Sequence, residues 1–168
     1  MKLPFENCYV VDTNVLITLM KYYPQNNPTF KAIWDEIEEL IKQKNMFSTS
    51  VVYDEILKYL GKDDRLKKWA MVHKKRFFIP TNPEIFQLAK DIVKDFPDLL
   101  DKKKQETGEP DADPFVIALA KSEAVAIITQ ERDDPNKIRI PTVAQHYNIK
   151  CIDLFEFFAK RGLKFIKE

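Results

Sequence analysis

Asp12 is an acidic residue enclosed by two apolar runs, in the stretch CYVVDTNVLITLM. The apolar residues 8–11 lead directly into it, and the segment that follows Asn14 is again almost entirely apolar. A buried carboxylate without a partner is costly, so it usually shifts its pKa and loses its charge. Asp12 therefore either caps the start of a helix or faces a cation.

Three further acidic residues occupy positions that would bring them towards Asp12. Glu55 lies early in the helix after the second predicted strand, and Glu131 comes two residues after the fourth. Asp113 opens the helix that leads into the fourth strand, so its placement depends on the fold. Helical spacing puts Glu55 and Asp113 on, or at the edge of, faces that pack inward. Because ligands bind beyond the carboxyl ends of strands in parallel sheets, we expect the carboxylates to converge there.

Several carboxylates in one place would repel each other and lose hydration. A divalent cation removes both problems, and carboxylate ligands without His or Cys suit Mg²⁺ or Mn²⁺. Each residue also has a structural alternative. Asp12 could cap a helix, and Asp113 could be the N-cap that precedes Pro114. Glu55 and Glu131 could be solvated side chains, so the ordered set is more informative than any member.

Alternating strand and helix patterns position these residues. Short apolar runs predict strands over 8–11, 46–49, 77–79, 125–129 and 150–152. Helices are predicted over 13–23, in a segment capped by Asn27, over 50–60 with Ser50 as cap and Gly61 at the end, over 62–76, 84–94 and 113–122, at Pro141, and after Asp153. A flexible loop is expected over about 101–112. The alternation predicts an α/β fold with a mainly parallel sheet.

The composition excludes several classes of function. A length of 168 residues fits one domain, 1–168. Only three glycines are present, and no GxGxxG or GxxxxGK[ST] phosphate loop and no GxSxG nucleophile elbow occurs. The net charge of +1 says little about partners.

The cysteines and the apolar runs bear on the cellular location. Two cysteines without a CxxC pattern argue against a disulfide framework or a zinc site and favour the reducing cytoplasm. Asp12 interrupts the N-terminal apolar stretch, which argues against a signal peptide. No run approaches the roughly 18 apolar residues of a membrane span, so no membrane association is expected.

Three segments, in this order over most of the chain, together resemble a PIN domain, the nuclease fold of many prokaryotic toxins and several RNA-processing enzymes. VVDTNVLI resembles the first strand with its acid, Asp12, and STSVVYDEI resembles the segment with the second acid, Glu55. DADPFVIALAKSEAVAIITQE resembles the third-acid helix and the next strand. Asp113 matches the third acid best, and Asp111 is a neighbour that could substitute or assist. The resemblance implies a three-layer α/β/α fold with a central, mainly parallel five-stranded sheet.

The fourth acidic position departs from the family pattern. Many PIN domains follow the strand with Thr, then a nearby Asn or Asp, and then Asp-Phe. Here the sequence after Thr129 is QERDD, without Phe. Glu131 is the predicted fourth acid, and Asp133 and Asp134 are the alternatives behind it.

The resemblance implies a metal-dependent ribonuclease that leaves a 5′-phosphate and a 3′-hydroxyl. One or two Mg²⁺ or Mn²⁺ ions would be held by Asp12, Glu55 and Asp113. Glu131 would contribute directly or through water. Thr13 and Asn14 would hydrogen-bond a carboxylate or phosphate oxygen, or else cap the first helix. The family further implies an antitoxin protein as partner, if the chain is a type II toxin, and a homodimer.

A basic stretch, KYLGKDDRLKKWAMVHKKR over 58–76, carries nine Lys, Arg or His residues. With Trp69 and Tyr59 interleaved, it could follow an RNA backbone and stack a base. The candidate RNA contacts are Lys67, Lys68, Lys74, Lys75 and Arg76. The alternative is a solvated helix face with Trp69 in the core. The lysines 102–104 are expected to be solvated.

Two other classes of function are alternatives to the ribonuclease. A catalytically weak PIN-like module could bind RNA or protein, and the divergent fourth position keeps this alternative open. A small phosphohydrolase of the haloacid-dehalogenase type would need DxDxT, whereas DTN follows the strand here. The ribonuclease is therefore the leading hypothesis.

Overall fold

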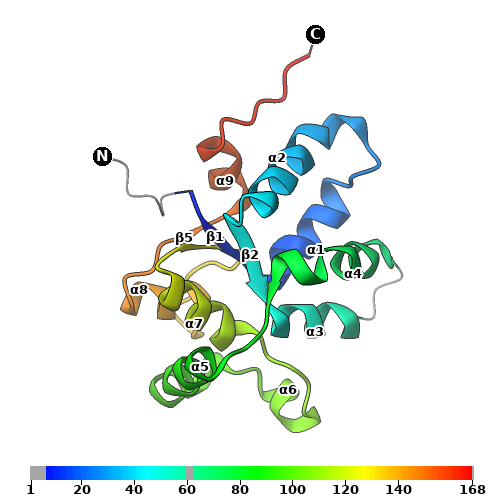
Figure 1. Cartoon of the computed structure of the whole chain (residues 1–168). Helices are drawn as coiled ribbons and strands as arrows, with labels where there is room; N and C mark the ends of the chain where they lie inside the picture. The colour runs from blue at the N-terminus through cyan, green and yellow to red at the C-terminus, as the bar shows by residue number, and fades with distance from the viewer. Residues whose placement is uncertain (1–6, 60–62, 168) are drawn as a thin grey trace.

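Five parallel strands form the central sheet in a computed structural model that describes residues 7–59 and 63–167. The strand order is β3-β2-β1-β4-β5, and Figure 1 labels β5, β1 and β2 of this sheet. The strands are β1 Tyr9–Val11, β2 Met46–Thr49, β3 Phe78–Ile79, β4 Ala126–Ile128 and β5 Cys151–Ile152. Every neighbouring pair runs parallel, with Val11 opposite Ile128 and Thr49 opposite Ile79. The predicted parallel five-stranded sheet is therefore confirmed.

Helices and two short 3-10 turns connect the strands. The helices are α1 Thr13–Tyr22, α2 Lys31–Lys42, α3 Ser50–Lys58, α4 Arg65–Phe77, α5 Pro83–Asp95, α6 Lys102–Thr107, α7 Asp113–Glu123, α8 Ile140–His146 and α9 Leu154–Lys160. The 3-10 turns are Pro28–Phe30 and Pro97–Leu99. Local side-chain caps start several helices, among them Asn82 for α5 and, as predicted, Asp153 for α9.

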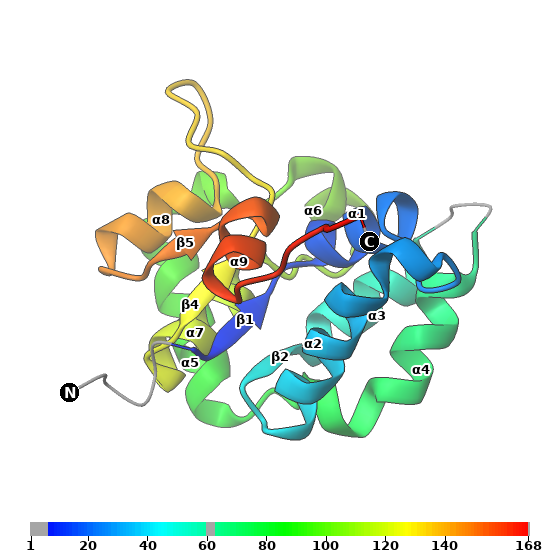
Figure 2. The same ribbon diagram turned by 90° about the horizontal axis from the view of Figure 1, so that it is seen from above.

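The helices cover both faces of the sheet, which gives three layers. Helix α7 packs on β1, β2 and β4, with α5 behind it, and α2 and α4 pack against β2 from the other side (Figures 1 and 2). Helix α9 lies beside α2, and its Phe157 meets the ring of Tyr9 edge-on at 5.5 Å. Since both faces are covered, all three residues of β1 are buried. The three-layer α/β/α prediction is confirmed.

Three details differ from the sequence predictions or lie outside the described residues. Helix α3 is capped by Thr49 and not by Ser50, because the Thr49 hydroxyl accepts from the Val51 and Val52 amides at 3.0 and 3.2 Å. Gly61, predicted to close this helix, lies outside the described residues. The predicted flexible loop 101–112 contains α6, whose N-cap is Asp101.

The core is a single apolar cluster that includes residues from all five strands. Cys8 and Cys151 are both free thiols, as expected from their spacing. Among the described helices, none has the length and apolar character needed to cross a bilayer. The carboxyl ends of β1 and β2 point towards α6 and the starts of α1 and α3 (Figures 1 and 2), which fixes where a site can form.

Candidate active site

A cavity of about 250 Å³ lies at the carboxyl ends of the strands and gathers acidic residues from six positions in the sequence. Its acidic lining is Asp12, Glu55, Asp101, Asp111, Asp113 and Glu131. Its basic lining is Lys104, Lys137 and Arg139, and Thr13 and Asn14 complete the polar wall. The structure thus brings together all four acids that the sequence singled out.

Asp12 is almost fully buried, with 3% of its surface exposed, at the junction of β1 and α1. Its Oδ1 accepts from the Thr13 amide at 2.7 Å, and its Oδ2 accepts from the Thr129 hydroxyl at 2.8 Å. Burial raises the pKa of Asp12 to about 7, and repulsion from Glu131 adds to the rise. Asp12 can therefore cap a helix and face a cation at the same time. Its carboxylate caps α1, and the negative charge of that carboxylate is still uncompensated.

Thr129 connects β1 to β4 at the floor of the cavity. Its hydroxyl donates to Asp12 and accepts from the Glu131 amide at 3.1 Å. Asn14 adds a second connection, because its Oδ1 accepts from the Gln130 amide at 3.0 Å. Thr129 was not among the predicted site residues. The available signal was a polar residue directly after a buried strand, and its side chain is indeed buried.

Glu55 is held on both carboxylate oxygens. Its Oε1 accepts from the Ala112 amide at 2.7 Å, and its Oε2 forms an ion pair with Lys104 Nζ at 3.1 Å. Burial raises the pKa of Glu55, while the charge of Lys104 opposes the rise. Burial alone would lower the pKa of Lys104, but attraction to Glu55 raises it overall. The prediction that lysines 102–104 are all solvated is therefore wrong for Lys104.

Asp113 lies in the first turn of α7, where Ala112 occupies the N-cap position. The proposal that Asp113 is only an N-cap is therefore wrong. Burial, followed by repulsion from Asp12 and Glu131, raises the pKa of Asp113 well above its usual value. Its carboxylate accepts no hydrogen bond and forms no ion pair within the described residues.

Asp111 has a different task, although it lines the same cavity. Its Oδ2 accepts from the Asp101 amide at 2.8 Å, and its Oδ1 accepts from the Asp113 amide at 3.4 Å. Asp111 therefore joins the start of α6 to the start of α7. This placement suits a residue that positions Asp113 and Lys104.

Glu131 is the only one of the three fourth-acid candidates that lines the cavity. Its Oε2 accepts from the Ile140 amide at 3.0 Å, which fixes the carboxylate at the start of α8. Asp133 instead accepts from the Thr142 hydroxyl at 2.8 Å, and Asp134 pairs with Arg139 at 3.5 Å. The structure places these two aspartates beside the cavity and not in its wall.

The predicted RNA-contact residues lie along α4 and do not line this cavity. Lys68 pairs with Asp64 at 3.1 Å, and Lys74 lies over the ring of Tyr53 at 5.0 Å. Trp69 is 5% exposed, so the alternative that places it in the core is confirmed and a base-stacking role for it is wrong. Lys67 remains partly exposed on the same helix.

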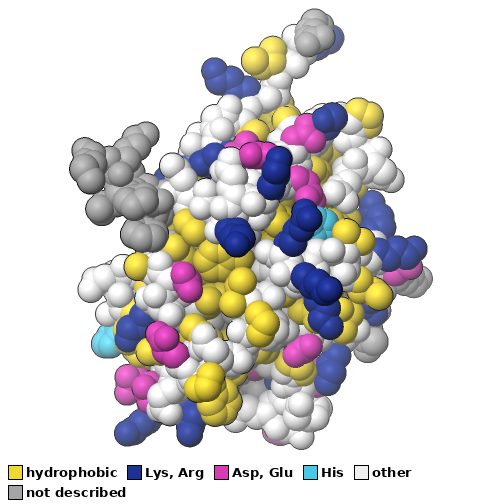
Figure 3. Space-filling view, viewed as in Figure 1, with side chains coloured by type: hydrophobic (Ala, Val, Ile, Leu, Met, Phe, Trp, Pro, Cys, Tyr) yellow, Lys and Arg dark blue, Asp and Glu magenta, His cyan; other side chains and the backbone are white. Residues whose placement is uncertain are grey.

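Lys75 and Arg76 line a separate groove of about 680 Å³, together with Lys42 and Lys44. Lys44 and Arg76 precede β2 and β3, so this groove lies at the amino ends of the strands, away from the carboxylates. In Figure 3, Lys and Arg side chains gather where α2, β2 and α4 lie. The three basic residues that do line the acidic cavity were not predicted, since two of them follow Glu131 in an irregular loop.

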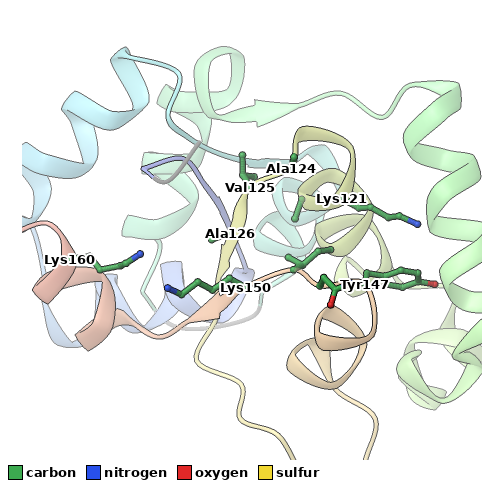
Figure 4. A pocket seen from close by; sticks show the side chains of 10 residues that line it. Lys121, Ala124, Val125, Ala126, Tyr147, Lys150 and Lys160 are labelled. Carbon is green, nitrogen blue, oxygen red and sulfur yellow. The ribbon is translucent and has the colours of Figure 1, made fainter. Parts of the chain in front are cut away.

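Another hollow, of about 610 Å³, also lies at the amino ends, between the end of α7 and the starts of β4 and β5 (Figure 4). Its lining includes Lys121, whose ammonium lies 4.3 Å from the centre of the Tyr147 ring, and Lys150. Among the residues that the structure describes, no acidic side chain lines this hollow. The convergence of titratable groups, and not size, therefore makes the acidic cavity the candidate site.

The donor set of the acidic cavity fits a hard divalent cation. All acidic side chains offer oxygen, and the Thr13 hydroxyl in the same wall is buried without a hydrogen-bond partner. No three carboxylates, His or Cys of the described residues already stand in a metal-binding arrangement. One of the carboxylates, that of Glu55, is instead paired with the ammonium group of Lys104. The oxygen donors of the cavity therefore fit a hard divalent cation in their chemistry.

Comparisons with known proteins bear on the family and on the fold of the chain. The model of a family described as a domain of unknown function, DUF4411, matches residues 9–165, and no curated protein matches the chain. One chain of VapBC-1 from nontypeable Haemophilus influenzae has a TM-score of 0.54 and 17% identity, covering 87% of this chain and 97% of that chain. One chain of VapBC2 from Rickettsia felis, bound to a DNA fragment from the promoter, has a TM-score of 0.52 and 13% identity, covering 87% and 98%. At these identities the likeness concerns the fold.

Proposed function

Because the chain belongs to the DUF4411 family and has a PIN-like fold, we propose that it is a ribonuclease that depends on Mg²⁺ or Mn²⁺. The observation that carries the proposal is the convergence of Asp12, Glu55, Asp113 and Glu131 on one cavity. Burial, followed by repulsion between the carboxylates, raises the pKa of Asp12 and Asp113. Such perturbed groups in a cleft are typical of functional sites.

The carboxylates would hold one or two ions, with Asp12 and Asp113 as the central ligands and Glu131 at the side. When bound, the ion supplies a water of lowered pKa and counters charge on the phosphate under attack. Thr129 and Asn14 hold the ends of β1 and β4 together and so fix the distance between Asp12 and Glu131. This prepositioning is what a reaction dominated by electrostatics requires.

Two basic residues of the cavity wall suit the phosphate backbone of the substrate. Lys137 is exposed, and the buried Arg139 Nε has no hydrogen-bond partner in the described structure. Lys and Arg side chains are the usual partners of phosphate oxygens. We assign these two residues to substrate binding, so that the scissile phosphate lies between them and the carboxylates.

A narrower proposal is that the chain is the toxin of a type II toxin–antitoxin pair in the cytoplasm. The resemblance of the sequence motifs to such toxins motivates it, and the shared fold with the two VapBC proteins agrees with it. An antitoxin protein and a second copy of the chain are then the proposed partners. Co-expression with the product of an adjacent small reading frame tests the antitoxin: a stable complex and loss of RNA cleavage are expected.

One observation favours a second candidate function, a catalytically weak module that binds RNA or protein. Lys104 already neutralises Glu55, and no ready-made metal cage exists in the described part of the chain. RNA binding without cleavage at any Mn²⁺ concentration is the result that this alternative predicts.

Incubation of the purified protein with several single-stranded RNAs and Mn²⁺ separates the two functions. We expect the wild type to cleave and to leave 5′-phosphate ends, and Asp12→Asn to cleave at least about 100-fold more slowly. Asp54→Asn is the matched control, because Asp54 is an exposed acid of α3 outside the cavity, and it should cleave like the wild type. Equal cleavage by Asp12→Asn, or none by the wild type, would refute the ribonuclease.

A further inference from the structure

Lys104 is a cation supplied by the chain itself to the acidic cavity. Its Nζ lies 3.1 Å from Glu55 Oε2, and 29% of the Lys104 side chain and 14% of the Glu55 side chain are exposed. Since 49 residues separate the two in sequence, the contact is a product of the fold. It is distinct from the loose pairing of surface lysines, because both partners face the cavity.

Lys104 lies on helix α6 and not in an irregular loop. Asp101 Oδ1 accepts from the Lys104 amide at 3.1 Å and so caps α6. The Asp101 amide donates to Asp111, which in turn contacts the start of α7. Gly108 ends α6 with a φ of +68°, a conformation that favours glycine. The ammonium group is therefore held at the cavity from both ends of α6.

Charge is balanced on one side of the cavity and unbalanced on the other. Both oxygens of Glu55 have partners, one of which is the Lys104 ammonium. Asp12 and Glu131 accept only from uncharged N–H or O–H groups, and Asp113 accepts from none in the described residues. Lys104 also attracts Asp111 and Asp113 across the cavity, but it forms its ion pair with Glu55, so among the described residues the carboxylates of Asp12, Asp113 and Glu131 are the ones without an ion-pair partner.

We infer that Lys104 takes the place of a second metal ion, so that the site binds a single divalent cation on Asp12, Asp113 and Glu131. Glu55 then serves to hold Lys104 and the Ala112 amide instead of coordinating the ion. The inference rests on the proposed function in one respect, namely that the cavity binds a divalent cation at all. It goes further by fixing the number of ions and by giving Lys104 a task.

The number of Mn²⁺ ions bound per chain, measured by equilibrium dialysis with electron paramagnetic resonance of free Mn²⁺, tests the inference. We expect one ion for the wild type. Lys104→Met frees the Glu55 carboxylate and should bind two ions, whereas Lys103→Met, which removes an adjacent exposed lysine, should still bind one. Lys104→Gln repeats the test with a polar side chain, and circular dichroism verifies that each variant is folded.

A double variant gives the decisive comparison. Glu55→Gln with Lys104→Met removes the ion pair without changing the net charge of the cavity. We expect it to bind one Mn²⁺ with a Kd within about threefold of the wild type. A loss of affinity of tenfold or more, which corresponds to about 1.4 kcal/mol, would make Glu55 a ligand and overturn the inference.

The remaining outcomes separate this inference from the proposed function. Two ions in the wild type, or one ion in both Lys104→Met and Lys104→Gln, would overturn the inference and leave the ribonuclease proposal intact. No Mn²⁺ binding by the folded wild type would refute both. One ion in the wild type and two in Lys104→Met supports the inference whether or not a suitable RNA has been found.

Discussion

Asp12 makes hydrogen bonds that stabilise the fold, and its negative charge is one that a bound cation would compensate. Its two oxygens cap α1 and accept from Thr129, so its hydrogen bonds are made. Its charge remains uncompensated, because no cation lies beside it in the described structure and Glu131 is close enough to repel it. Hydrogen bonding and charge compensation are separate requirements, and the proposed metal ion would meet the second.

The raised pKa of Asp12 predicts how stability depends on pH. The folded value is about 7, against roughly 4 in an unfolded chain, so folding takes up a proton between these values. Stability should therefore fall as pH rises from about 4 to 7 in the absence of metal. Asp12→Asn should weaken this dependence and raise the unfolding midpoint at pH 7.5 by roughly 5 °C.

Thermal unfolding in EDTA at pH 5.5 and pH 7.5 checks this prediction. Addition of Mn²⁺ at pH 7.5 should stabilise the wild type more than Asp12→Asn, because the ion relieves the same repulsion. The explanation fails if the wild type is less stable at pH 5.5 than at pH 7.5, or if Asp12→Asn lowers stability at pH 7.5.

Thr129 is predicted to position Asp12 and Glu131. Thr129→Val keeps the shape of the side chain but removes the hydroxyl that contacts both residues. We expect a loss of stability of about 1–2 kcal/mol and a fall in RNA cleavage of at least about tenfold. Thr129→Ser, which keeps the hydroxyl, should restore most of the cleavage rate at the same Mn²⁺ concentration. Equal cleavage rates for Val and Ser would show that the hydroxyl does not matter.

At the scale of elements, apolar runs and caps were enough to predict the strands and most helices. Strand β1 and helix α7 were predicted close to their observed bounds, because buried strands and capped amphipathic helices leave strong local patterns. Helix α6 was not predicted, since six polar residues between a cap and a glycine resemble a solvated loop. The four acids were predicted from their positions relative to these elements. Lys104 was not, because its partner lies 49 residues away.

Helix α6 depends on its N-cap, which offers a test at this scale. Asp101→Ala removes the side chain that accepts from the Lys104 amide and should destabilise α6 by about 1 kcal/mol. Hydrogen exchange over 102–107 should accelerate, while exchange in α5 stays unchanged. Asp98→Ala is the matched control, because Asp98 is an exposed acid that does not contact α6 through a hydrogen bond. Unchanged exchange in Asp101→Ala would mean that other contacts hold the helix.

At the scale of the whole molecule, the two ends of the sheet carry opposite charge character. The acidic cavity lies at the carboxyl ends of the strands, and the groove with Lys75 and Arg76 lies at the amino ends. The sequence alone could not show whether the basic residues of α4 face the acidic cavity or the groove at the other end of the sheet. A run of basic residues on one helix does not indicate which of them face the site. An acidic residue at the carboxyl end of a parallel strand, in contrast, is expected to face the site from the topology alone.

The two sets of basic residues make competing predictions for RNA binding. If the cavity wall binds the scissile phosphate, Lys137→Ala should raise the KM for RNA about tenfold and Lys75→Ala should change it less than twofold. If α4 follows the RNA, the order of the two effects is reversed. Steady-state cleavage of one labelled RNA by both variants, at fixed salt, decides between them.

The central claim is that the converging carboxylates hold the cation with which the molecule cleaves RNA. Single-turnover cleavage of a labelled single-stranded RNA across a series of Mn²⁺ concentrations tests it most directly, with the wild type beside Asp113→Asn. We predict that the wild-type rate rises with Mn²⁺ to a plateau and is abolished by EDTA, and that Asp113→Asn does not cleave at any concentration. Cleavage that persists in EDTA, or the same Mn²⁺ dependence in Asp113→Asn, would contradict it.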